Sequence, residues 1–100
     1  GNIEMELEAN ARERKDEFSL SMYPNPFTNT FVLKIFSDEE QNFVLSISDV
    51  NGKIVDRKKL TIGKGENIIP YDGSMLSSGL YFYQAATLNH TLTGKVIKSN

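Results

Sequence analysis

The sequence has no cysteine, a single histidine and only short apolar runs. Without cysteine, disulfides, thiol chemistry and thiolate metal sites are excluded. The apolar runs are a few residues long, so no segment predicts a membrane-spanning helix. Eleven Lys and Arg stand against 13 Asp and Glu, which gives a formal net charge of −2. A nucleic-acid partner is not expected, because it needs a surplus of cations to neutralise its phosphates.

What is present describes one small folded domain. The chain has 100 residues, of which 39% are hydrophobic and 24% are charged. That composition is typical of a globular domain and differs from that of a disordered chain. The sequence opens with Gly1-Asn2-Ile3, without Met and without a signal peptide. We therefore expect it to be a domain of a longer protein.

Charge divides the chain near residue 17. Residues 1–17 carry a net charge of −3 and residues 18–100 a net charge of +1. Ile3, Leu7 and Ala11 are spaced four apart, so they would share one face of a helix. That stripe is thin, and a short isolated helix is marginal in water. We expect residues 1–17 to be a linker or the tail of a preceding domain, with a short packed helix as the alternative.

From Phe18 onward the apolar period changes to two residues, which predicts strands. Residues 80–87 are apolar on both faces and predict a central strand, whereas the charged residues 56–59 predict an edge strand. Pro70 is expected to end the fifth strand, and residues 72–79 to form a loop with room for one helical turn. The fold predicted for residues 18–100 is an all-β, seven-stranded antiparallel β-sandwich of immunoglobulin-like or fibronectin-like type. The expected strands are residues 18–23, 31–36, 43–48, 53–60, 67–69, 80–87 and 92–98.

The first informative turn lies at Asn51-Gly52. A two-residue loop there sets Ile47 opposite Asp56, whereas a three-residue loop with a bulge at Gly52 sets Ile47 opposite Val55. A one-residue slip moves every side chain to the other face, so the apolar match favours the bulged turn.

The second informative turn is the last hairpin, marked by Asn89-His90. A two-residue loop there sets Tyr83 opposite Val96 and diagonal to Gly94, whose bare backbone the tyrosine ring can cover.

No catalytic constellation is visible. His90 falls in a predicted turn, where a solvated residue is the expected outcome. One histidine without cysteine gives a transition metal little to bind. Residues 38–40 are acidic but lack the spacing of a calcium loop. No serine has a base to pair with, so we expect no enzyme, no cofactor and no small-molecule substrate.

Four tyrosines raise the question of a sugar-stacking platform. Because a whole core must be built from few aromatic residues, Tyr81 and Tyr83 are expected in the core, and Tyr23 is expected to pack on the proline turn. The fourth tyrosine of the sequence is Tyr71.

Four short motifs follow one another along the chain, at residues 23–27 (Tyr-Pro-Asn-Pro-Phe), 49–55 (Asp-Val-Asn-Gly-Lys-Ile-Val), 76–81 (Leu-Ser-Ser-Gly-Leu-Tyr) and 95–98 (Lys-Val-Ile-Lys). In this order they resemble the C-terminal sorting domain, type A, of the type IX (Por) secretion system of Bacteroidetes. The resemblance covers residues 18–100.

The resemblance implies a role as an address label. Members are the last domain of exported proteins whose cargo domain precedes them. The cargo crosses the inner membrane, passes through the periplasm and reaches the outer-membrane translocon. In many cases a sortase-like peptidase then removes the domain. The implied partners are the translocon, that peptidase and the cargo, and the implied location is the cell surface or exterior.

A physical hypothesis for recognition follows. The rigid two-proline turn is expected to project Asn25, and the terminal strand is expected at a sheet edge beside Lys95, where a receptor adds a strand. Alternatively, Lys95 only prevents edge aggregation. Gly52 and Gly79 are expected to serve turns. The candidate sorting residues are Tyr23, Pro24, Asn25, Pro26, Asp49, Gly52, Lys53, Gly79, Tyr81, Lys95 and Lys98.

Two other functions fit a non-catalytic sandwich. One is an Ig-like accessory module that binds glycan or spaces catalytic domains, which predicts an exposed row of aromatic side chains. The other is an adhesin module that binds through exposed strand edges.

Overall fold

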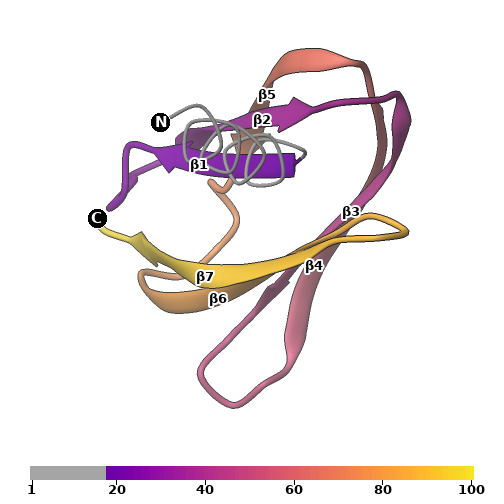
Figure 1. The fold of residues 1–100 in the computed structure, drawn as a ribbon. Helices are drawn as coiled ribbons and strands as arrows, with labels where there is room; N and C mark the ends of the chain where they lie inside the picture. The colour runs from indigo at the N-terminus through magenta and orange to yellow at the C-terminus, as the bar shows by residue number, and fades with distance from the viewer. Residues whose placement is uncertain (1–17) are drawn as a thin grey trace, which may run out of the picture.

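The computed structural model describes residues 18–100, and the expectation of a linker or short helix in residues 1–17 lies outside them. The described chain forms seven strands, shown in Figure 1, and contains no helix. It therefore has no helix long and apolar enough to cross a membrane. The strands are β1 (Phe18–Tyr23), β2 (Thr30–Ser37), β3 (Gln41–Ser48), β4 (Ile54–Ile62), β5 (Gly65–Asp72), β6 (Gly79–Ala86) and β7 (Thr91–Lys98).

The strands form two antiparallel sheets that face each other. One sheet has the order β1-β2-β5 and the other the order β4-β3-β6-β7. In Figure 1 the three-stranded sheet lies above the four-stranded one. The predicted seven-stranded β-sandwich is confirmed, as are the edge position of β4 and the central position of β6.

Alternate residues of each strand point between the sheets and form the core. In β2, for example, Phe31, Leu33 and Ile35 are fully buried, while Lys34 and Phe36 at the alternate positions are exposed. This alternation explains why a two-residue period in the sequence is enough to predict strands with one wet face.

β5 differs from its prediction, because it does not stop at Pro70. The strand runs from Gly65 to Asp72, and Pro70 lies opposite Val32 of β2. Proline lacks a donor, but β5 is an edge strand that pairs only with β2, so a missing N–H on its open side leaves no ladder bond unmade. β4 likewise extends two residues past its predicted end.

The turn between β3 and β4 is the bulged three-residue turn that the sequence favours. The Asp49 N–H donates to the Lys53 carbonyl at 2.9 Å, and the Gly52 N–H donates to the Asp49 carbonyl at 3.0 Å. Gly52 has a φ of 85°, in the left-handed region where glycine is least strained.

The register beyond this turn is nevertheless not the predicted one. The ladder shifts by one residue, so that Ile47 lies opposite Asp56 and not opposite Val55. Ile54 and Val55 are consequently both exposed, at 51% and 38%. The shift turns Asp56 inward, where its carboxylate accepts a hydrogen bond from the Tyr71 hydroxyl of the other sheet. The predicted register considered only the pairing of apolar residues within this hairpin, so it could not include a contact between the two sheets.

The last hairpin is also displaced by two residues from its predicted pairing. Its loop is residues 88–89, because the Thr87 N–H donates to the His90 carbonyl at 2.8 Å. The ring of His90 stacks on Phe18, with centroids 5.5 Å apart, and the residue is half-buried. His90 is therefore not the solvated loop residue that was expected. This packing places it at the end of the ladder and leaves Leu88 in the loop, 94% exposed.

As a result Tyr83 lies directly opposite Gly94, and the pairing with Val96 was wrong. The idea that the tyrosine covers the glycine is confirmed. A Cβ atom at Gly94 would lie 2.5 Å from the Tyr83 ring, so no larger residue fits without displacing it.

The loop between β5 and β6 contains no helical turn. Its hydrogen-bonded element is a single turn, in which the Leu76 N–H donates to the Gly73 carbonyl at 3.1 Å.

Candidate functional site

One end of the sandwich collects all four sequence motifs. β1, β5 and β7 end there, and β2 and β6 begin there. The β3–β4 turn lies at the same end, because Ser48 pairs with Phe82 near the start of β6. Figure 1 shows the C-terminus beside the connection between β1 and β2. We call this region the motif end; it comprises residues 23–30, 49–53, 72–79 and 95–99.

Asn25 ties the two-proline turn to the edge of β7. Its side-chain amide donates to the Lys95 carbonyl at 3.1 Å, and its side-chain oxygen accepts from the Ile97 N–H at 2.9 Å. Asn25 is exposed, but both ends of its amide are bonded to backbone. The turn therefore does not project the Asn25 side chain away from the fold, and recognition of Asn25 by a receptor stays a prediction. The side chain instead completes hydrogen bonds that an edge strand leaves open.

Phe27 continues this attachment. Its N–H donates to the Ile97 carbonyl at 2.9 Å and its carbonyl accepts from the Ser99 N–H at 2.8 Å, forming a parallel bridge with Lys98. The side chain is 1% exposed and meets the Phe31 ring edge-on, with centroids 4.9 Å apart. Residues 25–27 thus cover the C-terminal part of the β7 edge.

Gly73 lies against the Phe27 ring on the other side. A Cβ atom at this position would be 2.5 Å from the ring, so the close approach requires glycine. Its N–H donates to the Asn29 carbonyl at 2.8 Å. Sequence reasoning placed Gly73 in a loop and missed this role; its only signal was a glycine next to Asp72.

Lys98, the last residue of the terminal motif, is buried, with 8% of its surface exposed. Its Nζ donates to the Gly73 carbonyl at 2.8 Å and lies 5.5 Å from the centre of the Phe27 ring. A buried ammonium group needs such partners, because leaving it unpaired is costly. Lys98 therefore joins the C-terminus to the β5–β6 loop and is not available on the surface.

The third motif is held by an internal bond. The buried Tyr81 hydroxyl donates to the Ser77 carbonyl at 2.6 Å, and Gly79 opens β6 with a φ of 148°. The second motif closes itself in the same way. The Asp49 carboxylate accepts from the N–H groups of Asn51 at 2.9 Å and Lys53 at 3.0 Å. In both motifs the distinctive side chain, Asp49 or Tyr81, thus forms hydrogen bonds within its own motif.

Five of the eleven candidate residues have exposed side chains for which the structure gives no hydrogen bond or ion pair. Tyr23 is 47% exposed, so it does not serve the core. Together these five side chains form the outward part of the motif end. They are Tyr23, Pro24, Pro26, Lys53 and Lys95.

A separate polar contact closes the opposite side of the sandwich. The Tyr71 hydroxyl of β5 donates to Asp56 of β4, and Tyr71 also stacks on Phe31 with centroids 4.7 Å apart. Burial, together with the bond to Asp56, raises the pKa of Tyr71 above its ordinary value. The phenol therefore stays protonated and acts as a donor. A cleft of about 300 Å³ lies beside this pair, lined by Leu33 and Leu45 among others.

The remaining chemistry-bearing residues do not assemble. In residues 18–100 no group of three or more His, Asp or Glu side chains could hold a metal ion. The tyrosines do not form an exposed row, because Tyr71 and Tyr81 are buried and Tyr83 is half-buried.

A comparison with protein families identifies the family of the chain. The model of the secretion system C-terminal sorting domain matches residues 21–99. The chain belongs to this family. A search of curated proteins finds no match. The sorting domain is a C-terminal signal for type IX secretion. It implies a fused cargo, recognition by the type IX system, and export out of the cell, either in secreted form or on the surface.

Sorting domains are not a catalytic family, in keeping with the expectation that the domain itself does no chemistry. The family match does not favour the alternative of a glycan-binding or spacer module.

Proposed function

We propose that this domain delivers a cargo, fused before it, to the type IX translocon of a Bacteroidetes bacterium, as a sorting domain of type A. The cargo crosses the periplasm before it reaches the outer membrane, and a sortase-like peptidase then removes the domain. The observation that carries the proposal is the family match over residues 21–99, which includes nearly all of the folded part.

Residues 1–17 serve, in this proposal, as the linker to the cargo. The support comes from the position of Phe18. It begins β1 opposite Ser37, at the end of the sandwich away from residues 23–30. A cargo attached there leaves the motif end unobstructed, so a receptor reaches the motifs while the cargo is folded.

The candidate residues divide into two roles. Asn25, Asp49, Gly52, Gly79, Tyr81 and Lys98 position the backbone of the motif end through the bonds and turns described above. The five outward side chains are the ones that a receptor contacts. A folded display of this kind loses less conformational entropy on binding than a linear peptide would.

Strand addition to β7 is a narrower possibility within this proposal. β7 is an edge strand, as the sequence predicts, but residues 25–27 already cover its edge from Lys95 onward. Only the stretch from Thr91 to Gly94 is left for a receptor strand.

The test is an export assay with a reporter protein fused ahead of the chain in a type IX-secreting host. Deleting residues 18–100 should leave the reporter inside the cell. Tyr23→Ala combined with Lys95→Ala should reduce export at least tenfold while the unfolding midpoint of the domain stays unchanged. The matched control is Lys64→Ala, an exposed lysine of the β4–β5 turn at the other end. Unchanged export of the double variant would remove these two side chains from the recognition surface.

A further inference from the structure

The outer face of the four-stranded sheet has an unusual charge composition. The register places Arg57 and Lys59 of β4 beside Ser46 and Val44 of β3, on the face that points away from the core. Lys95 of β7 lies on the same face. We call it the basic sheet face; it comprises Asn42, Val44, Ser46, Ser48, Ile54, Arg57, Lys59, Thr61, Leu80, Phe82, Gln84, Ala86, Thr91, Thr93, Lys95 and Ile97.

The strands of this face carry no outward carboxylate. The four strands of the sheet contain one acidic residue, Asp56, and it points inward to Tyr71. In the adjoining turns, Asp49 is bonded to backbone N–H groups, and Glu39 and Glu40 line a hollow with Val44 at the far end of the face, away from Phe82 and Lys95. Within residues 18–100 none of Arg57, Lys59 and Lys95 forms an ion pair.

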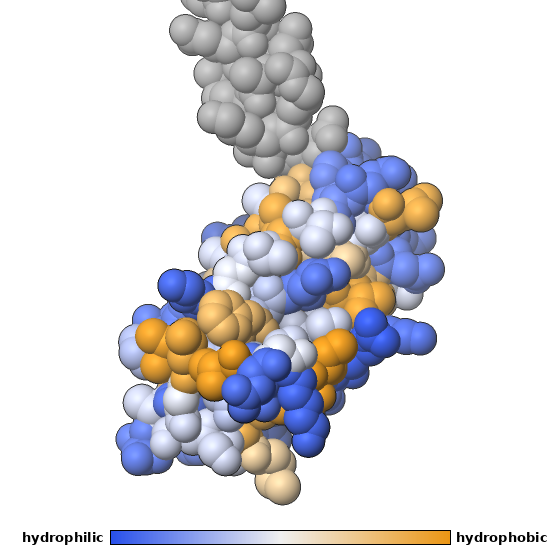
Figure 2. Space-filling view, turned by 90° about the horizontal axis from the view of Figure 1, so that it is seen from below, coloured by the Kyte–Doolittle hydropathy of each residue, from blue (hydrophilic) through white to orange (hydrophobic). Residues whose placement is uncertain are grey.

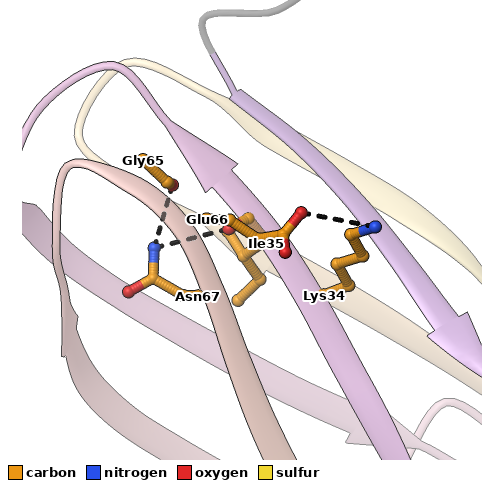
Figure 3. A network of polar contacts seen from close by, with 5 residues as sticks. All are labelled: Lys34, Ile35, Gly65, Glu66 and Asn67. Atoms are coloured by element: carbon orange, nitrogen blue, oxygen red, sulfur yellow. Dashed lines mark hydrogen bonds and ion pairs between the residues drawn. The ribbon is translucent and has the colours of Figure 1, made fainter.

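On the outer face of the three-stranded sheet, by contrast, the lysine is paired with an acid. There Lys34 forms an ion pair with Glu66 on the neighbouring strand, at 3.3 Å (Figure 3). Asn67 next to it bonds to the carbonyls of Ile35 and Gly65. The protein thus balances a cation within one sheet face and leaves three cations unbalanced on the other.

The basic sheet face is also partly apolar. Phe82 is 39% exposed on the central strand β6, and Lys95 lies directly opposite it. Ile54 and Ile97 are 51% and 41% exposed on the two edge strands. Figure 2, seen from the side of the four-stranded sheet, shows apolar side chains interleaved with strongly hydrophilic ones. The strand spacing of about 4.8 Å makes the face about 14 Å wide between its edge strands.

Protection against edge aggregation accounts for part of this pattern. Lysine and arginine on β4 and β7 discourage pairing with another chain. That role does not require the absence of acids across the whole face, and it does not account for an exposed phenylalanine on an interior strand. An exposed aromatic side chain beside a cation, here Phe82 next to Lys95 on a face that also carries Arg57 and Lys59, is typical of a protein interface.

We infer that the basic sheet face docks an acidic protein surface, one that places an apolar side chain on Phe82 and carboxylates opposite Arg57, Lys59 and Lys95. The inference rests on the proposed function and adds a second contact surface, distinct from the five outward residues except for the shared Lys95. Charge complementarity selects the partner, and Phe82 provides the apolar contact.

The first experiment identifies what touches the face. A photoreactive residue is introduced as Phe82→benzoylphenylalanine in the exported fusion, with Ile68→benzoylphenylalanine as the control. Ile68 is 53% exposed on the other sheet. Position 82 should crosslink to a protein, through a segment rich in Asp and Glu, and position 68 should not. An adduct with lipid or polysaccharide, a non-acidic segment, or equal crosslinking from both positions overturns the inference.

The second experiment tests the charges. Arg57→Glu/Lys59→Glu, which leaves the shared Lys95 intact, should reduce export at least tenfold, and replacing the crosslinked carboxylates of the partner by lysine should restore it. The matched control is Lys34→Glu/Lys64→Glu, which changes net charge equally away from the face. Unfolding midpoints confirm that both double variants fold. If the face variant does not fold, the single variant Arg57→Glu, with at least a threefold loss, takes its place.

The outcomes separate the two proposals. Export that persists after deletion of residues 18–100 defeats the proposed function. Export that stops on deletion but is normal in the face variant defeats only the inference drawn from the basic sheet face.

Discussion

The two ends of the sandwich are held together by different kinds of contact. At the motif end, hydrogen bonds join Asn25 to Lys95 and Ile97, residues 70 and 72 apart in the chain, and Lys98 reaches Gly73, 25 residues away. At the far end, which holds residues 37–41, 62–67 and 87–90, the side-chain bonds join residues two to four apart, with one exception, the 3.4 Å bond from the Asn67 amide to the Ile35 carbonyl.

The far end illustrates how local those bonds are. The Ser37 hydroxyl donates to the Glu39 carbonyl at 2.6 Å and accepts from the Gln41 side chain at 2.7 Å. Asn67 both accepts from the Gly63 N–H and donates to its carbonyl, each at 2.9 Å. Such bonds can form as soon as a turn forms, whereas the two bonds of Asn25 at the motif end require β1 and β7 to be already in place.

This difference has a consequence for the proposed sorting function, because the sorting motifs lie at the motif end. A signal displayed at an end that forms only in the complete fold is present when folding is finished and absent before. In the function proposed above, the motif end therefore couples recognition to folding, and the cargo is joined at the far end.

The largest effect should come from Phe27→Ala. Removing a fully buried phenyl ring leaves a cavity between Phe31, Gly73 and the Lys98 ammonium, and should lower the free energy of unfolding by about 3–5 kcal/mol. Denaturant unfolding measures the change. A loss below about 1 kcal/mol would mean that the motif end is not a packed unit, and the comparison of the two ends would fail.

A matched pair of asparagine variants sharpens the comparison. Asn25→Ala removes two bonds to β7, and Asn67→Ala removes the bonds of one turn together with a longer bond to the Ile35 carbonyl. Each variant should cost about 1 kcal/mol in unfolding free energy. Amide hydrogen exchange distinguishes them. The Ile97 amide should exchange faster in Asn25→Ala and be unchanged in Asn67→Ala. Equal acceleration of Ile97 in both variants would show that the two ends are not independently held.

The smallest effect concerns Asp72, at the start of the motif-end loop. Hydrogen bonds from the Ser74 hydroxyl and N–H hold the pKa of this exposed carboxyl below its ordinary value. Its contribution to stability is therefore present above the unfolded-state pKa and is lost as the pH falls through the folded-state pKa. Ser74→Ala should move the pKa upward, as measured by NMR titration of the carboxyl carbon. An unmoved pKa would contradict the assignment of the loop bonds.

Several elements could be predicted from the sequence, because they depend on neighbours along the chain. The strand around Phe31 and Leu33 follows from alternation, the bulged turn follows from Asp49 and Gly52, and the edge position of β4 follows from its charges. The register of two hairpins could not be predicted. Asp56 turns inward to meet Tyr71 on the other sheet, and the half-buried position of His90 depends on Phe18.

The candidate site shows the same limit. The motifs point to the correct segments, and the exposed state of Lys95 is what its edge strand suggests. The linear motif does not indicate that Lys98, three residues after Lys95, is buried. It also does not indicate that the Lys98 ammonium group donates a hydrogen bond to the Gly73 carbonyl.

By itself the sequence determined the strands, most of the turns and the family, because alternation, glycine, proline and motif order act over a few residues. Only the tertiary structure decided which motif side chains face inward, that Asn25 and Phe27 close the edge of β7, and that one sheet face is left basic and unpaired. These features depend on contacts between residues far apart in the chain, whose meeting is set by the packing of two sheets.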